Sequence, residues 1–325
     1  MHAATAYAHP NIALVKYWGK SNDDLNVPAT PSLALTLGDL RTTTRIEAAA
    51  SEVVVVDGHQ VRDAKIERWL ERLRGAFNLP PLRIESSSDF PANSGLASSA
   101  SGFAALTLAI SSAFDLDLSL QEQCEWARFG SGSAARSLHG GFVALESEGD
   151  VCRASQILDE NEWNLAIAVA ITSDSVKSTG STAGMTASRE TSPFYDGWLR
   201  ATIEAFDLGL VAVKNKDFDA LAKIAEASCR QMHALMLSTE PALIYWNAAT
   251  LNCIDAVTRM RKDGINVFYT IDAGSHVKAV CEADVVTRVS EQLSRVDGVH
   301  SVIGSGIGGP AQIKDSSSPG KVSDD

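Results

Sequence analysis

The stretch from Phe90 to Phe103, FPANSGLASSASGF, decides the fold, because its small residues run directly into the apolar helical pattern AALTLAI. A helix N-terminus leaves its first N–H groups unpaired and carries partial positive charge. A phosphate binds there when the backbone can approach it closely, which small residues permit. The plain alternative is a tight turn with Gly95 in a left-handed conformation and Ser98 as a helix cap.

The composition is typical of a soluble globular protein. The 325 residues are 45% hydrophobic, which predicts a large core in two domains or in one two-lobed α+β unit. No apolar run reaches the roughly 18 residues of a membrane helix, and the first residues do not form a signal peptide, so we expect a cytoplasmic protein. The net charge of -12 disfavours nucleic acid and membrane partners, so an anionic substrate would need a local basic pocket.

The five cysteines are scattered and form no C-x-x-C pair, which argues against disulfides and structural zinc and predicts buried thiols. His9, His139, His233 and His276 have no metal-ligand spacing, and we assign no side chain as a metal ligand from the sequence.

The apolar patterns alternate between strand and helix periods. Strands are predicted over 11–18, 32–37, 42–50, 52–61, 82–87, 141–147, 164–172, 266–272 and 301–313. Helices are predicted from the opening stretch to about Phe114 and over 119–130, 195–215, 217–237, 241–264 and 285–296. Ser119 and Glu122 fit a capping box. This order predicts long helices packed on antiparallel sheet.

Four motifs then resemble a known family. Pro91 followed by 95–100 has the form P-x-x-x-G-L-x-S-S-A, which resembles the phosphate loop of the GHMP kinases. The segments NIALVKYWGK (11–20), GSGSAARSLHGGF (130–142) and FYTIDAG (268–274) resemble signatures of the diphosphomevalonate decarboxylase family, in that family's order. The segments at 181–185 and 233–247 also fit, so the resemblance covers nearly the whole chain.

The resemblance implies a two-lobed GHMP kinase fold, with an N-terminal lobe like domain 2 of ribosomal protein S5 and a ferredoxin-like C-terminal lobe. We expect the lobes at 1–180 and 181–314 and a disordered tail at 315–325. The implied reaction phosphorylates the C3 hydroxyl of mevalonate 5-diphosphate with ATP and Mg²⁺, then releases phosphate and carbon dioxide to give isopentenyl diphosphate. A homodimer is also implied.

By the same resemblance, Asp272 orients or deprotonates the hydroxyl, Lys16 stabilises this aspartate and the transferring phosphate, and Arg136 forks onto the substrate carboxylate. The alternatives are a helix N-cap for Asp272, an exposed turn arginine for Arg136, and a lysine at a strand edge whose ammonium reaches solvent for Lys16. Further substrate contacts are expected from Tyr17, Trp18, Gly19, Lys20, Ser131, Gly132, Ser133, Ala134, Ala135, Ser181 and Thr182. ATP contacts are expected from Ser94, Gly95, Leu96, Ala97, Ser98, Ser99 and Ala100.

The chain departs from the family pattern at three places. Ala135 replaces a cysteine, Ser275-His276 replaces Pro-Asn, and Thr30, Pro31 and Ala34 replace polar positions. The last change leaves mevalonate 5-phosphate as an alternative substrate.

Two further hypotheses belong to different functional classes. A kinase without decarboxylation predicts loss of Lys16 or Arg136, and a catalytically silent binding protein predicts decay of Asp272 or of the loop at 91–100. The sequence retains all of these features.

Overall fold

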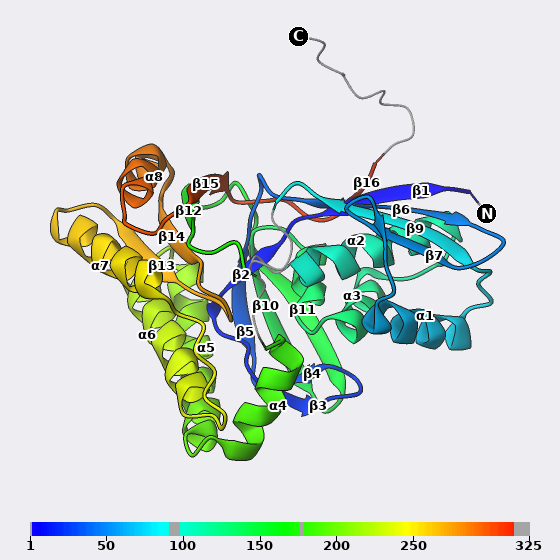
Figure 1. The fold of residues 1–325 in the computed structure, drawn as a ribbon, viewed down its shortest axis with the longest axis horizontal. Helices are drawn as coiled ribbons and strands as arrows, with labels where there is room; N and C mark the ends of the chain where they lie inside the picture. Colours follow the sequence, from blue (N-terminus) through cyan, green and yellow to red (C-terminus); the bar gives the residue numbers. More distant parts are fainter. Residues whose placement is uncertain (1, 91–97, 176–178, 315–325) are drawn as a thin grey trace, which may run out of the picture.

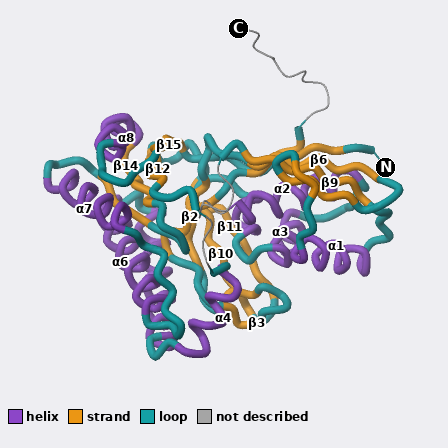
Figure 2. The backbone as a smooth tube through the Cα atoms, viewed as in Figure 1, coloured by secondary structure: helices purple, strands orange, loops and turns teal. Residues whose placement is uncertain are grey.

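The chain folds into an α+β structure whose helices flank a central set of strands (Figures 1 and 2). This computed structural model describes residues 2–90, 98–175 and 179–314. The predicted tail at 315–325 lies outside these residues. All five cysteines are buried and free of disulfides, as predicted.

The first sheet has six strands in the order β16-β1-β6-β9-β7-β8. All its pairs are antiparallel except β7 with β9. Its strands are β1 (Ala4–Ala8), β6 (Thr42–Ala48), β7 (Val53–Val56), β8 (His59–Gln60), β9 (Leu82–Ser88) and β16 (Gln312–Ile313). Helix α2 (Ser98–Ala113) packs on β1 and β6, and next to it lie α3 (Leu120–Gly130) and α1 (Ala64–Ala76) (Figure 1). Ser119 forms the predicted capping box of α3 with Glu122.

A second sheet, in the order β11-β10-β5-β2, lies in the middle of the molecule (Figure 1). Its strands are β2 (Asn11–Val15), β5 (Ser32–Thr36), β10 (Phe142–Glu148) and β11 (Val151–Leu158). Every residue of β2 and β5 is buried, which explains their nearly continuous apolar sequences. A short hairpin of β3 (Lys20–Asn22) with β4 (Val27–Pro28) follows β2, and the 3-10 helix η1 (Ala134–Leu138) precedes β10.

The third sheet is antiparallel, in the order β13-β14-β12-β15. Its strands are β12 (Leu165–Ile171), β13 (Val267–Thr270), β14 (Val277–Glu282) and β15 (Ser301–Gly306). The short η2 (Ala283–Val285) connects β14 to α8. The helices of this part are α4 (Ser181–Thr191), α5 (Tyr195–Lys214), α6 (Phe218–Leu237), α7 (Ala248–Lys262) and α8 (Val286–Ser294).

One buried apolar cluster joins the second and third sheets. It contains Leu33 of β5, Ile167 of β12, Phe206 of α5 and Val280 of β14. Burial on this scale makes relative movement of the two sheets costly, since each side chain loses apolar contact when they separate. The ends of β2 and β13 are therefore held at a fixed distance.

Two predicted elements need correction. The helix predicted over 241–264 begins at Ala248, because the Asn247 side chain caps it in a box with Thr250. The single strand predicted over 301–313 is two strands, β15 and β16, which belong to different sheets. Strands β1, β3, β4, β11 and β14 and helices α1 and α4 were not predicted. The division at about residue 180 stays a prediction.

Candidate active site

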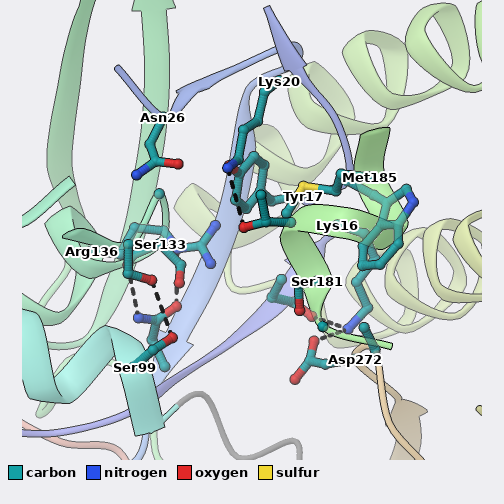
Figure 3. Close-up of a pocket in the computed structure, with 18 of the residues that line it drawn as sticks. Lys16, Tyr17, Lys20, Asn26, Ser99, Ser133, Arg136, Ser181, Met185 and Asp272 are labelled. Atoms are coloured by element: carbon teal, nitrogen blue, oxygen red, sulfur yellow. Dashed lines mark hydrogen bonds and ion pairs between the residues drawn. The ribbon is translucent and has the colours of Figure 1, made fainter. Parts of the chain in front are cut away.

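A cavity of about 390 Å³ opens where five segments of the chain meet. They are the end of β2, the start of α2, the loop from α3 into η1, the start of α4, and the loop after β13. Figure 3 shows Lys16, Arg136, Ser181 and Asp272 around this space, although they come from four separate segments. Its lining holds more cationic than anionic side chains, so an anionic ligand fits its charge.

Lys16 and Asp272 form an ion pair on one wall of the cavity. The Nζ atom of Lys16 lies 2.6 Å from Oδ1 of Asp272 and 2.8 Å from the carbonyl oxygen of Ala13. The Lys16 side chain is 1% exposed, so the alternative of a lysine reaching solvent from a strand edge is wrong. The hydroxyl of Thr270 also donates to the Ala13 carbonyl, at 3.0 Å, and this bond joins β13 to β2.

Asp272 follows β13 in a loop that leads to β14, not to a helix. The helix N-cap alternative is therefore wrong. Burial by itself raises the pKa of this carboxyl, but the ammonium groups of Lys16 and Lys278 outweigh it and hold the pKa well below its usual range. Asp272 is thus a carboxylate at neutral pH and a weak proton acceptor.

Arg136 is 3% exposed and lies in η1, so the alternative of an exposed turn arginine is wrong. Its Nε donates to Oδ1 of Asn11 at 3.0 Å, and its Nη1 donates to Oγ of Ser32 at 2.5 Å. Within the described residues no carboxylate oxygen lies within 4.0 Å of this guanidinium. Burial lowers its pKa to about 10, and it stays charged at neutral pH. A buried guanidinium with N–H groups to spare is suited to a planar anion.

Tyr17 presents a buried hydroxyl to the cavity and has no hydrogen-bond partner within the described residues. Burial raises its pKa, although nearby Arg136 opposes this, so the hydroxyl remains a donor. A Cβ at Gly132 would lie 2.3 Å from this hydroxyl oxygen, so the glycine leaves room for the Tyr17 side chain in its present position. Trp18 is 2% exposed and packs among Met185, Trp198 and other apolar side chains, as a core aromatic would.

Lys20 is buried, and its Nζ lies 3.4 Å from Oγ1 of Thr182. Burial lowers its pKa, and nearby cations such as Lys65 lower it further, against the opposing effect of Asp23. A second cavity of about 440 Å³ adjoins the first at Lys20. The charged side chains that line it are Lys20, Lys65, Arg68, Arg72, Asp23, Asp24 and Glu71. Because cations outnumber carboxylates in this lining, the second cavity extends the positive charge of the first.

The start of α2 closes the other side of the cavity. Ser98 and Ser99 line it, and Oγ of Ser99 lies 3.2 Å from Oγ of Ser131. The predicted ATP contacts at Ser94, Gly95, Leu96 and Ala97 lie outside the described residues, as does the predicted left-handed Gly95. The structure therefore places two of the predicted phosphate-binding serines opposite the 130–136 loop.

Most predicted site residues meet in this one cavity. Its lining includes Lys16, Tyr17, Trp18, Lys20, Ser98, Ser99, Ser131, Gly132, Ser133, Arg136, Ser181, Thr182 and Asp272. Among the predicted residues that the structure describes, Gly19, Ala100, Ala134 and Ala135 do not line it. The three alanines are buried beneath it, and Gly19 has φ of 126° where a Cβ would lie 2.5 Å from the hydroxyl of Tyr195.

Sequence reasoning missed the residues that hold the site together. Asn11 and Ser32 aim the guanidinium of Arg136, and Lys278 pairs with Asp272. Asn11 belongs to a recognised motif, but only the fold shows which arginine its amide contacts. Lys278 had a local signal, because a lysine inside the apolar run of β14 is unusual.

Within the described residues no group of three His, Cys, Asp or Glu side chains could hold a metal ion. The hydroxyl-bearing residues Ser98, Ser99 and Ser131 line the cavity at the start of α2. Their hydroxyl oxygens fit a hard cation, such as Mg²⁺, whose other ligands are supplied by phosphate and water.

Among the described residues, no helix has the length and the apolar character that crossing a bilayer requires.

Two family models together match almost all of the chain. The diphosphomevalonate decarboxylase-like N-terminal domain matches residues 8–156. The mevalonate 5-diphosphate decarboxylase C-terminal domain matches residues 167–314.

Individual proteins agree with these models. Diphosphomevalonate decarboxylase of Candida albicans is 34% identical over 84% of this chain and 83% of its own. Phosphomevalonate decarboxylase of Haloferax volcanii is 31% identical over 97% and 98% of the two chains. A solved structure described as MDDEF in complex with MVAPP, AMPPCP and magnesium has a TM-score of 0.89 and 32% identity, and the match covers 97% of this chain and 99% of that one.

Proposed function

Because the chain belongs to the diphosphomevalonate decarboxylase family, we propose that it converts mevalonate 5-diphosphate and ATP to isopentenyl diphosphate, ADP, phosphate and carbon dioxide. The observation that carries this proposal is the meeting of Lys16, Arg136 and Asp272 in one cavity beside the start of α2. Phosphoryl transfer needs an oriented hydroxyl and cations around the phosphate, and decarboxylation needs a held carboxylate.

Asp272 accepts a hydrogen bond from the C3 hydroxyl, and this bond directs the hydroxyl oxygen toward the γ-phosphorus of ATP. The bond from this phosphorus to ADP breaks as the new O–P bond forms. Because its pKa is depressed, Asp272 orients the hydroxyl more than it removes the proton, and the loose transition state of phosphoryl transfer requires little base. Lys16, already 2.6 Å from Asp272, supplies a positive charge to the transferring group.

Arg136 holds the substrate carboxylate with the N–H groups that Asn11 and Ser32 leave unused. The C3–O bond then breaks and phosphate leaves. The electrons of the bond between C2 and the carboxyl carbon form the new double bond, and carbon dioxide is released. The hydroxyl proton leaves on the phosphate, so charge and atoms balance.

The diphosphate of the substrate lies near Tyr17 and Lys20. The hydroxyl of Tyr17 is buried and has no protein partner among the described residues. Lys20 is buried and has no carboxylate within 4.0 Å among the same residues. Lys65 and Arg68 extend the positive charge into the adjoining cavity, where a second phosphate fits. Tyr17, Lys20, Lys65 and Arg68 together therefore support mevalonate 5-diphosphate, and not the 5-phosphate, as the substrate.

ATP places its phosphates against the N-terminus of α2, where the first backbone N–H groups have no partner within the helix and the hydroxyls of Ser98 and Ser99 line the cavity. Mg²⁺, when bound with ATP, neutralises charge on the phosphates. Magnesium and an ATP analogue are both named for the related solved structure.

The test is to incubate the protein with ATP, Mg²⁺ and mevalonate carrying zero, one or two 5-phosphates. ADP, phosphate and carbon dioxide are measured separately. Equal amounts of all three, with the diphosphate only, are the expected result. ADP without carbon dioxide would indicate a kinase, and no ADP with any substrate would indicate a binding protein.

Mevalonate 5-phosphate is a second candidate substrate. Two observations favour it: the relative from Haloferax volcanii covers nearly the whole chain, and Thr30, Pro31 and Ala34 depart from the family pattern. Turnover with the monophosphate alone would assign this activity and leave the chemistry at Lys16, Arg136 and Asp272 unchanged.

We also propose a cytoplasmic homodimer. Helix α5 exposes Ile203, Leu208 and Val211, which are 48%, 60% and 57% accessible and offer apolar surface for a second copy. Light scattering after size-exclusion chromatography distinguishes a dimer of about twice the 34.5 kDa chain mass from a monomer.

A further inference from the structure

Lys278 is a charged side chain in the interior of the third sheet. It lies on β14, is 0% exposed, and pairs across the sheet with Thr270 of β13 and Val169 of β12. It is the one charged residue from Val277 to Cys281, in a strand that ends at Glu282. An ammonium group buried this deeply is costly unless it has a charged partner.

That partner is the catalytic carboxylate. The Nζ atom of Lys278 lies 3.3 Å from Oδ2 of Asp272, while Lys16 binds Oδ1 at 2.6 Å. The two ammonium groups thus face opposite oxygens of one carboxylate, Lys16 through a hydrogen bond and Lys278 through an ion pair without one. Lys16 lines the cavity, whereas Lys278 does not, so Lys278 reaches the reaction only through Asp272.

The other titratable groups that face Asp272 are Arg136 from η1 and Cys229 and His233 from α6. Burial raises the pKa of the Cys229 thiol to about 11. Burial, together with Lys16, lowers the pKa of His233 to about 3. Both are therefore uncharged between pH 5 and 9. Burial lowers the pKa of Lys278, and the Asp272 carboxylate opposes this, so the cationic groups that face Asp272 are Lys16, Lys278 and Arg136.

Bound substrates change this balance. On the proposed function, the γ-phosphate and the substrate carboxylate bring negative charge beside Asp272, which favours its protonation. Lys16 and Arg136 face the cavity and are drawn toward these ligands, whereas Lys278 is enclosed by the sheet and cannot follow. We propose that Lys278 is a positioning residue: it is the counter-ion that stays with Asp272 during turnover, keeps it ionised and fixes its second oxygen.

The test compares Lys278→Met, which removes the charge at similar size, with Lys278→Arg, which keeps a cation. Val280→Ala on the same strand is the matched control, since it removes apolar contact from the core and no charge. We expect kcat of Lys278→Met to fall about 10- to 100-fold at pH 7, with little change in KM. The acid limb of its kcat profile should move up by about one pH unit or more, because the pKa of Asp272 rises.

Lys278→Arg should keep the wild-type acid limb, and Val280→Ala should lower only the melting temperature. If Lys278→Met has the kcat and pH profile of Val280→Ala, the lysine is structural and the proposal is wrong. If Lys278→Met does not fold, Lys278→Gln replaces it, with the same expected shift.

A second readout does not depend on activity. The ¹³C resonance of the Asp272 carboxyl, assigned by its absence in Asp272→Asn, is titrated in wild type and in Lys278→Met. A higher pKa in the variant supports the proposal even if the wild-type protein releases no carbon dioxide, which would overturn the proposed function alone. Equal titration in the two proteins overturns the inference.

Discussion

The ammonium of Lys16 and the carboxylate of Asp272 are 2.6 Å apart, although 256 positions separate them in the sequence. Hydrogen bonds hold the segment of Lys16 and the segment of Asp272 in place. The Ala13 carbonyl of β2 accepts hydrogen bonds from Lys16 and from Thr270 of β13, and the backbone N–H of Lys16 donates to Ser228 of α6 at 3.0 Å. Three elements, β2, β13 and α6, therefore position this one ion pair.

Asp272→Asn keeps the shape of the side chain and removes its charge. We expect kcat to fall about 10³-fold or more, while the dissociation constant of the substrate changes little. Isotope release from carboxyl-labelled substrate measures the first quantity and calorimetry the second. Asp255→Asn, at an exposed ion pair of α7, is the control. A variant that kept most of its rate would remove Asp272 from the chemistry.

Arg136→Lys replaces a planar fork by a single ammonium. We expect kcat/KM to fall about 100-fold, because the lysine cannot keep its bonds to Asn11 and Ser32 and also bind a carboxylate with two parallel bonds. Steady-state kinetics measure this, with Arg259→Lys on the surface of α7 for comparison. Near-normal kinetics would place the substrate carboxylate elsewhere.

Gly132→Ala tests the position of the Tyr17 hydroxyl. The new Cβ would lie 2.3 Å from this oxygen, so the Tyr17 side chain must shift from its present position. We expect kcat/KM to fall about tenfold or more, mainly through KM. Gly197→Ala is the matched control: its Cβ meets nothing within 4 Å on α5, so activity should be unchanged and stability should rise by about 1 kcal/mol. Equal activity in the two variants would exclude Tyr17 from substrate binding.

Substrate affinity should depend on pH through Lys20. A lysine is charged below its pKa, and burial lowers this pKa, so the charge is lost at a lower pH than in an exposed lysine. The dissociation constant of mevalonate 5-diphosphate, measured by calorimetry from about pH 7 to about pH 10.5, should therefore rise on the alkaline side. Lys20→Arg should move this rise toward about pH 10, where Arg136 begins to lose its own proton. Identical alkaline limbs would mean that Lys20 is not near the diphosphate.

The sequence was sufficient to find the site because its residues lie in short local motifs. Four motifs of about ten positions each carry it: the small residues before α2 and the segments around Lys16, Arg136 and Asp272. The last three line one cavity, and the residues at 91–97 lie outside the described part of the chain. The capping box at Ser119 was equally local, since its two partners are three residues apart.

What the sequence did not reveal depends on contacts between distant segments. Asn11 and Arg136 are 125 residues apart, and no local pattern pairs them. The helix predicted from Pro241 was wrong by seven residues, because apolar spacing continued across the cap at Asn247. Helix α1 had a usable pattern in Ile66, Trp69, Leu70 and Leu73, with Asp63 as its cap, and it was overlooked between two strand-rich segments.

Leu33, Phe206 and Val280 come from different thirds of the polypeptide, yet they share one buried cluster. If the chain were cut between β11 and β12, each fragment would expose part of this apolar cluster to water. Each fragment expressed alone should therefore aggregate. Mixing the fragments would restore solubility and carbon dioxide release in the same step, because the contact that hides this surface is also the one that brings Lys16 to Asp272.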